Sequence, residues 1–157
     1  MTTIRTLLNK LLSTFCIILF AFLVLLVTWQ VASRYFFNAP SSFSEELAKY
    51  CFVWLALFGS AFVFGEKGHM AIEFLKEKFS KATQYRLNLF SELVTLLFAL
   101  IVMLIGGIQL VLMTWSQTSA SLGVSIGFLY SAVPLSGLFI VLYSLANMYT
   151  LSKEKRT

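Results

Sequence analysis

Charged residues are scarce in this chain, and aspartate does not occur in its sequence at all. Only 12% of the 157 residues are charged and 59% are hydrophobic. In an average soluble domain about 25% of the residues are charged and about 45–50% are apolar. The length is enough for one domain. A single small domain cannot bury this much apolar surface in its core, so the composition excludes an ordinary soluble domain and predicts an integral membrane protein.

Groups that bind metals or redox cofactors are almost as rare. His69 is the single histidine, and the two cysteines, Cys16 and Cys51, lie in apolar stretches where free thiols act as small hydrophobic groups. A haem held by two histidines of one chain is excluded, and a zinc site lacks ligands. We also find no nucleophile motif, no phosphate-binding glycine loop and no paired acids with a basic partner in a soluble pocket. We therefore expect no catalytic residue, metal site or cofactor in this chain, no enzyme activity, and a structural role for His69.

Long stretches without Asp, Glu, Lys or Arg define the predicted membrane spans. They are Leu11–Ser33, Tyr50–Gly65 and Leu93–Ser152, of which the last is long enough to cross twice. A helix needs about 20 apolar residues to span the hydrocarbon core. We predict an all-α integral membrane protein of one domain with four transmembrane helices, at about residues 11–32, 44–64, 85–115 and 128–149. The first run exceeds the core of a signal peptide, so we interpret it as a retained helix.

The basic residues predict the orientation. Ten of the twelve lysines and arginines lie in the N-terminal tail, the link between spans two and three, and the C-terminal tail, which share one face of a four-span protein. The positive-inside rule places that face, with both termini, in the cytoplasm. We interpret the net charge of +5 in this way rather than as a sign of nucleic-acid binding. The predicted location is a bacterial inner membrane, in contact with its lipids.

The link between spans two and three has an amphipathic pattern over Met70–Lys81. Ile72, Leu75 and Phe79 follow helical spacing, and Glu73 stands three residues before Lys76. This pattern predicts a short helix lying in the cytoplasmic interface. The alternative is a cytoplasmic extension of span three.

The segment between spans one and two is rich in turn and capping residues. Asn38 and Pro40 favour a turn, and Ser42 or Ser44 can cap the next helix. Glu45 and Glu46 then fall in its first turn, where the helix dipole favours negative charge. Arg34, at the end of span one, can pair with either glutamate. Alternatively, all three charges face lipid headgroups.

Glu92 falls about two turns inside span three. A carboxylate within the membrane is a functional candidate by default, but a proton or ion relay needs acidic or histidine partners that the spans lack. The other interpretation places Glu92 at the cytoplasmic interface.

Proline and small residues indicate how the helices pack. Pro134 predicts a kink in span four, and Gly106-Gly107 allow close approach or bending in span three. Trp54 is interpreted as a packing or interface anchor. Small residues four apart predict helix contacts. The pairs are Thr28 and Ala32, Ala56 and Ser60, and Ala132 and Ser136.

Several motifs together resemble one transporter family. Arg34-Tyr35-x-Phe37-Asn38-x-Pro40, then Phe43 and Ser44-Glu45-Glu46-Leu47, is similar to the segment between the first two helices in the small membrane subunit of tripartite ATP-independent periplasmic (TRAP) transporters. The resemblance continues through Tyr50, Phe52-Val53-Trp54, Gly59, Gly68-His69, Leu122–Ser125 and Tyr130–Leu135, which includes Pro134. Phe43 stands where tryptophan is expected, and Ser125 where proline is common.

The resemblance implies a four-helix subunit that binds a large membrane subunit and works with a soluble periplasmic substrate-binding protein. It implies uptake of an organic acid, such as sialic acid, a C4-dicarboxylate, or a keto or sugar acid, driven by a sodium gradient. Sodium and substrate are then expected in the large subunit. We expect this chain to scaffold that subunit, with residues Phe37–Ser44 and Ser116–Gly127 forming part of a periplasmic docking surface and Met70–Lys81 steadying the cytoplasmic side.

Two other functions fit a four-helix membrane protein. One is an independent transporter or channel made of identical copies, which needs polar groups facing a pore, and only Glu92 qualifies. The other is a membrane anchor of a redox complex, for which a single histidine offers few ligands.

Overall fold

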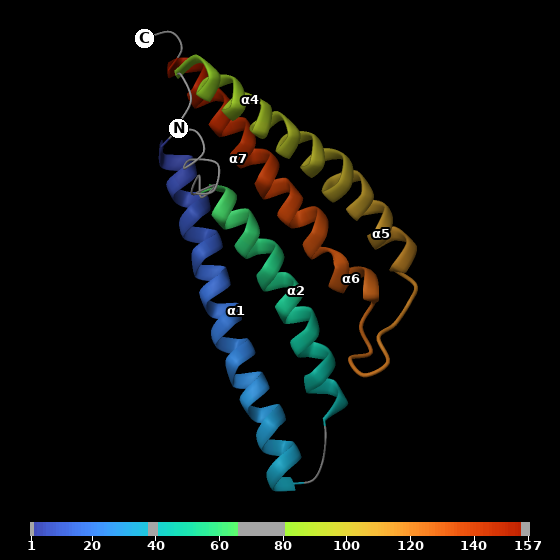
Figure 1. The fold of residues 1–157 in the computed structure, drawn as a ribbon. Helices are drawn as coiled ribbons and strands as arrows, with labels where there is room; N and C mark the ends of the chain where they lie inside the picture. Colours follow the sequence, from blue (N-terminus) through green and yellow to red (C-terminus); the bar gives the residue numbers. More distant parts are fainter. Residues whose placement is uncertain (1, 38–40, 66–80, 155–157) are drawn as a thin grey trace.

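The computed structural model describes residues 2–37, 41–65 and 81–154 (Figure 1). The helices are α1 (Thr2–Phe37), α2 (Ser42–Gly65), α4 (Lys81–Phe98), the π-helix η1 (Ala99–Gly106), α5 (Gly107–Thr114), α6 (Ile126–Tyr130) and α7 (Ala132–Glu154). Four stretches are long and apolar enough to cross a membrane, namely Arg5–Phe36, Ser42–Gly65, Thr83–Thr114 and Ile126–Ser152. The predicted all-α fold with four spans is confirmed. Asn38, Pro40, His69 and the predicted amphipathic helix up to residue 80 lie outside the described residues.

The helices are longer than the apolar stretches that predict them. α1 begins nine residues before Leu11 and continues past Arg34, and α7 runs on to Glu154. Charged side chains with flexible stems are good helix formers, so they mark where the membrane is expected to end without ending the helix.

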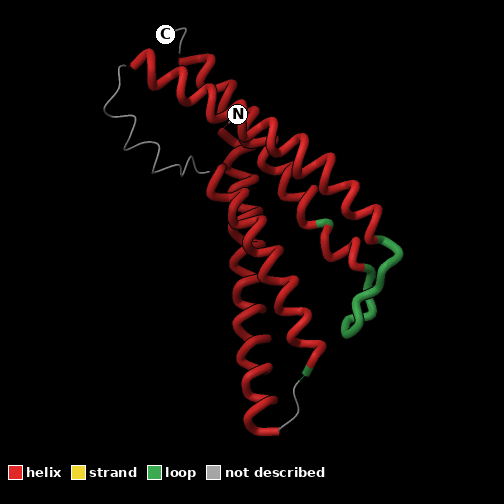
Figure 2. The backbone as a smooth tube through the Cα atoms, turned by 45° about the vertical axis from the view of Figure 1, so that its right-hand side comes forward, coloured by secondary structure: helices red, strands yellow, loops and turns green. Residues whose placement is uncertain are grey.

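The spans lie side by side in a single layer (Figure 1). α1 packs on α2, α2 on α7, and α7 on the third span, which comprises α4, η1 and α5. α1 begins and α7 ends at one end of the molecule, here called the terminal end. The loop end is the opposite one, where α2 begins and where the non-helical residues 115–125 lie (Figure 2). In this order α2 and α7 are the described spans that have helices on both sides.

The buried residues follow from this order. One cluster joins α2, η1 and α7 through Ala61, Ala99, Met103 and Ile140. A second cluster joins α1, α2 and α7 and contains Leu12, Phe58, Ala132 and Tyr143. Of the residues in the most apolar window of each span, 44% are buried in the fourth span but only 6% in the first. The fourth span is therefore the centre of the fold.

Glycines allow the third and fourth spans to approach closely. A Cβ added to Gly107 would lie 3.0 Å from Pro134 Cδ, one added to Gly137 2.6 Å from Met103 Cβ, and one added to Gly127 2.6 Å from the carbonyl oxygen of Val111. The close approach predicted at Gly107 is confirmed. Gly127 and Gly137 were not singled out from the sequence, although a glycine in an apolar span is the signal for such contacts.

Of the predicted small-residue pairs, one makes the contact expected of it. Ala132 and Ser136 are fully buried. Ala56, Ser60 and Thr28 are exposed instead, so the described residues of this chain do not cover them. They face outward because no further described helix covers the outer surfaces of a layer one helix thick.

The kink predicted at Pro134 is confirmed as a break between α6 and α7 at Ser131, seen in Figure 2 as a short non-helical stretch. Proline has no backbone N–H, so the carbonyl oxygen of Tyr130 loses its regular helical donor. At the break itself, the Ser131 hydroxyl donates to the carbonyl oxygen of Phe128 at 2.7 Å, and the Ser131 backbone N–H donates to the same oxygen at 3.2 Å.

Candidate functional site

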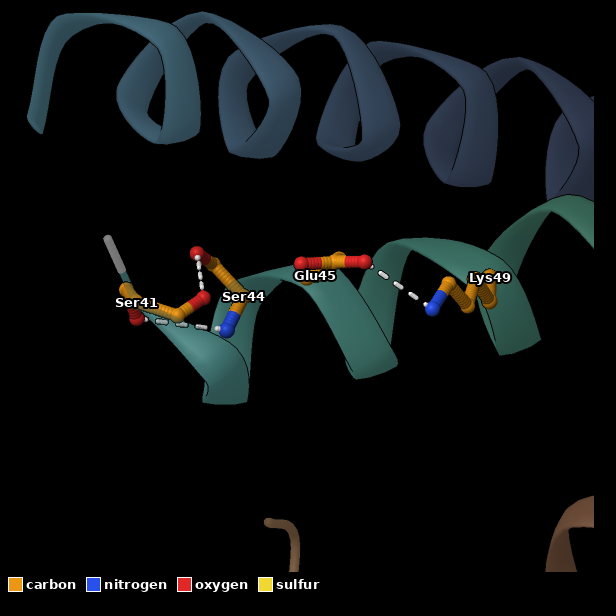
Figure 3. A network of polar contacts seen from close by, with 4 residues as sticks. All are labelled: Ser41, Ser44, Glu45 and Lys49. Carbon is orange, nitrogen blue, oxygen red and sulfur yellow. Dashed lines mark hydrogen bonds and ion pairs between the residues drawn. The ribbon is translucent and has the colours of Figure 1, made fainter. Parts of the chain in front are cut away.

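The first turn of α2 is capped by Ser41, which lies just outside the helix (Figure 3). The Ser44 N–H donates to Ser41 Oγ at 3.3 Å, and the Ser44 hydroxyl donates to the Ser41 carbonyl oxygen at 3.0 Å. The prediction that Ser42 or Ser44 provides the cap is therefore wrong, because Ser41 provides it. Ser41, Ser42 and Ser44 all have capping chemistry, and the backbone path of the turn decides which of them stands outside the helix.

Glu45 forms an ion pair within α2 (Figure 3). Its carboxylate lies 3.0 Å from Nζ of Lys49, one helical turn along the chain. Among the described residues, Arg34 forms no ion pair with a glutamate, and Glu45 pairs with Lys49 instead. Both of its side chains are substantially exposed, at 49% for Glu45 and 69% for Lys49. The pair therefore shapes the surface of the loop end rather than the core.

Glu46 connects the two halves of the chain at the loop end. Its Oε2 accepts a hydrogen bond of 3.0 Å from the backbone N–H of Ser121, which is 75 residues away in sequence. This contact fastens the segment between the third and fourth spans to the start of α2. Because a carboxylate is a strong acceptor for backbone N–H groups, the bond holds that segment in one place.

The segment 115–125 also has many internal hydrogen bonds. The N–H of Ser119 donates to the carbonyl oxygen of Val124 at 2.9 Å, and the Leu122 N–H donates to Ser119 Oγ at 3.0 Å. Gly123 has a φ of +67°, a backbone conformation that glycine adopts without strain. The Ser125 hydroxyl donates to the Trp115 carbonyl oxygen at 2.6 Å. The segment is therefore an ordered loop.

A cleft of about 520 Å³ opens between the start of α2 and this loop. Its walls are Ser42, Glu45, Glu46, Lys49, Tyr50 and Val53 of α2, with Ala120, Ser121 and Tyr130 opposite. The α2 residues recur every three or four positions and so lie along one face of the helix. The rings of Tyr50 and Tyr130 stand edge to face across the cleft, with centroids 6.4 Å apart.

Trp54 anchors α2 to α6. Its indole Nε1 donates a hydrogen bond of 2.8 Å to the carbonyl oxygen of Leu129, and its ring stacks on Phe58 with centroids 5.7 Å apart. This confirms the predicted packing role and adds a polar contact. Gly59 has no close neighbour, since an added Cβ would meet nothing within 4 Å. The packing of this chain therefore does not explain a glycine there.

Glu92 points from α4 toward α7. Its Oε2 accepts a hydrogen bond of 2.8 Å from the Ser144 hydroxyl, and its Oε1 accepts one of 3.0 Å from the Asn147 side-chain amide. The Asn147 Oδ1 is buried and has no hydrogen-bond partner among the described residues. The arrangement joins two helices through neutral donors, rather than exposing Glu92 to headgroups.

A polar network at the terminal end joins the first, second and fourth spans. The Tyr143 hydroxyl donates to Asn9 Oδ1 at 2.7 Å. Arg5 donates from Nε to the carbonyl oxygen of Gly65 at 3.1 Å, and from Nη2 to the same oxygen. An added Cβ on Gly65 would lie 2.5 Å from the Tyr143 ring. Sequence reasoning missed these contacts, because a single asparagine near a predicted span carries no signal of its distant partner.

Among the described residues, no three His, Cys, Asp or Glu side chains gather closely enough to hold a metal ion. The groups assembled at the loop end are hydrogen-bond donors and acceptors, one ion pair and two phenol rings, all held on ordered backbone. These are the elements of a binding surface.

Comparisons with known proteins point to one family. Residues 23–154 match the model of the family described as tripartite ATP-independent periplasmic transporters, DctQ component. The chain is 32% identical over 152 residues to a protein of Haemophilus influenzae named as a TRAP transporter small permease, covering 94% of this chain and 91% of the relative. It is 28% identical over 155 residues to the sialic acid TRAP transporter small permease SiaQ of Vibrio cholerae, covering 96% and 86%.

Proposed function

The chain belongs to the family of DctQ components of TRAP transporters, and we propose that it scaffolds the large permease subunit for sodium-coupled uptake of an organic acid. It is a small permease subunit and a multi-pass protein of the bacterial inner membrane. The family implies a complex of three parts, in which a large permease and a periplasmic binding protein are the partners.

The single-layer arrangement of the spans carries the scaffolding proposal. A layer one helix thick presents two broad apolar faces, and α1 leaves most of its side chains outside the fold. Lipid can cover both faces, but a subunit of a permanent complex uses one of them for its partner. In this proposal one lateral face of the layer packs against the large subunit and holds its immobile part in the membrane.

Exposed small residues on α2 support a close protein contact on that face. Ala56 and Ser60 lie outward, and a Cβ added to Gly59 between them would meet no described residue within 4 Å. Small residues let the backbone of another helix approach, whereas lipid gains nothing from them. We therefore place a helix of the large subunit against this part of α2.

The loop end suits the docking of the binding protein. The ordered loop is fastened to α2 through Glu46, and it exposes Gln117, Thr118 and Ala120. The basic tails and the link between the second and third spans belong at the opposite end, so the positive-inside rule places the loop end in the periplasm. Both termini are then cytoplasmic, and the amphipathic segment up to Lys81 steadies that side.

The family and its relatives support the proposed class of cargo. The relative in Vibrio cholerae is named for sialic acid, a carboxylated sugar. We propose an organic acid of that kind, a C4-dicarboxylate or a keto or sugar acid, with sodium and cargo bound in the large subunit and no cofactor in this chain. The narrower choice among these acids depends on the other two subunits.

Co-expression with the large subunit tests the scaffold. The variant A56L/S60L is expected to lose co-purification and sodium-driven uptake in proteoliposomes, because two leucines block the close approach. The size-conserving variant A56S/S60A is the control and should retain both. Intact assembly with the leucine variant would refute the α2 contact, and uptake by this chain alone would refute the scaffold role itself. Labelling of single cysteines placed in the two tails tests the orientation.

A further inference from the structure

We propose that the cleft at the loop end binds the headgroup of a phospholipid with a primary ammonium, of the phosphatidylethanolamine type. The cleft lies between the first three turns of α2 and the segment 120–130, and it is bridged at one point by the hydrogen bond from Ser121 to Glu46. In this position the lipid acts as a wedge between the α1–α2 hairpin and the hairpin of the third and fourth spans. The inference needs only the membrane location of the chain, and it holds for either orientation.

The depth of the cleft matches the headgroup layer. Its charged walls end at Lys49, and the uncharged stretch from Tyr50 to Gly65 begins directly below. Tyr50 and Tyr130 mark the same level, since tyrosines concentrate where the hydrocarbon meets the headgroups. A phospholipid next to α2 therefore has its phosphate and amine at the height of these side chains.

The charges in the cleft complement a zwitterion. Glu46 accepts from the Ser121 N–H and also interacts with the hydroxyls of Ser119 and Ser121, and it forms no ion pair among the described residues, so its negative charge is left to attract an ammonium group. Lys49 already contacts Glu45, yet it is 69% exposed and has donors left for a phosphate. The Tyr50 and Tyr130 rings add surfaces that attract a cation. A cationic protein side chain would satisfy Glu46 but leave Lys49 unused, so the pair of opposite charges favours the lipid.

The size of the cleft and its apolar lower edge also suit a phospholipid. A volume of about 520 Å³ is larger than one inserted side chain requires and leaves room for a headgroup with its glycerol. Toward the membrane centre the wall becomes apolar at Val53, and Phe52 and Phe128 expose 62% and 55% of their surfaces nearby. These side chains give the acyl chains a surface continuous with the headgroup site.

Native mass spectrometry of the full chain tests the proposal. The protein, released from detergent, is titrated with an equimolar mixture of dioleoyl phosphatidylethanolamine, phosphatidylcholine and phosphatidylglycerol. We expect one preferred adduct with phosphatidylethanolamine, because three methyl groups on choline remove the N–H donors that Glu46 accepts. E46Q and K49Q are each expected to weaken that adduct several-fold. K49Q keeps the bond from Ser121 to Glu46, so its effect does not depend on the loop staying in place.

R34Q is the matched control, since Arg34 is an exposed charge at the same end but outside the cleft. It should leave the adduct unchanged. Equal retention of the three lipids, preference for phosphatidylglycerol, or unchanged retention in both E46Q and K49Q would overturn the proposal. Equal binding of soluble glycerophosphoethanolamine would show that no membrane lipid is required and would also overturn it. The proposal would also be overturned if E46Q no longer captured the binding protein but still retained the lipid, because the cleft would then hold a protein side chain.

Discussion

The indole Nε1 of Trp54 donates a hydrogen bond of 2.8 Å to the carbonyl oxygen of Leu129, two residues before the break at Ser131. Hydrocarbon provides no donors, so polar contacts near a helix break must come from the protein itself. Trp54 provides one from α2 to the residue before Tyr130, whose carbonyl loses its helical donor to Pro134, and the same contact fixes α2 against α6. The interruption of the fourth span and its packing on the second therefore lie at the same place.

Replacing Trp54 by phenylalanine keeps the aromatic packing and removes this donor. We expect W54F to lower the free energy of unfolding by about 1–2 kcal/mol, because a buried acceptor loses its partner. Thermal unfolding in detergent, followed by the reaction of Cys16 and Cys51 with a thiol dye, measures the loss. W115F is the control, since the Trp115 ring is 58% exposed. An equal effect of the two variants would contradict the role given to the hydrogen bond.

Gly127 and Gly59 allow a comparison between a closely packed glycine and one with open space beside it. An added Cβ on Gly127 would lie 2.6 Å from the Val111 carbonyl oxygen and 2.9 Å from Trp115 Cα, both backbone atoms that cannot move aside alone. We expect G127A to destabilise the chain by about 1–3 kcal/mol through overpacking. G59A meets nothing within 4 Å and should match or exceed the stability of the parent. Thermal unfolding of both variants checks the contrast.

The hydrogen bond from Ser121 to Glu46 is expected to protect the backbone amides of the loop from hydrogen exchange. In E46A we expect the amide of Ser121 and its neighbours to exchange with deuterium several-fold faster, because the link to α2 is gone. E45A removes only the exposed contact with Lys49 and should leave exchange in the loop unchanged. Hydrogen exchange measured by mass spectrometry distinguishes them. Faster exchange in E45A as well would mean that the negative charge of this end, rather than the specific bond, holds the loop.

Glu92 offers a test of a structural role against a relay. E92A removes the acceptor for Ser144 and Asn147 and should cost about 1 kcal/mol for each interhelical bond that is lost. E92Q is expected to keep most of the stability, because its amide can accept from Ser144 and donate to the unpartnered Oδ1 of Asn147 after that side chain turns over. Uptake by the assembled transporter should persist in E92Q. Its complete loss would instead assign Glu92 a role in ion or proton movement.

The four spans were predictable from the sequence because the cost of placing charge in hydrocarbon acts on each short stretch separately. Charge-free runs identify the crossings, and Pro134 identifies the break in the fourth. The ends of the helices were not predictable in this way, since α1 continues through Lys10 and Arg34 without interruption. At the start of α2 the chemistry of capping was evident, but three neighbouring serines share it, and Ser41 is the one that the turn leaves outside the helix.

The four membrane crossings can be predicted from the sequence alone, because hydropathy and helix formation are local properties. The arrangement of the spans in one layer, in the order α1, α2, α7 and the third span, depends on packing between distant parts of the chain. The same packing brings Glu46 to Ser121 rather than to Arg34, and Glu92 to Ser144 and Asn147. Such partners lie 52–75 residues apart, and in apolar helices of similar composition only the fit of glycines, rings and polar groups across each contact selects them.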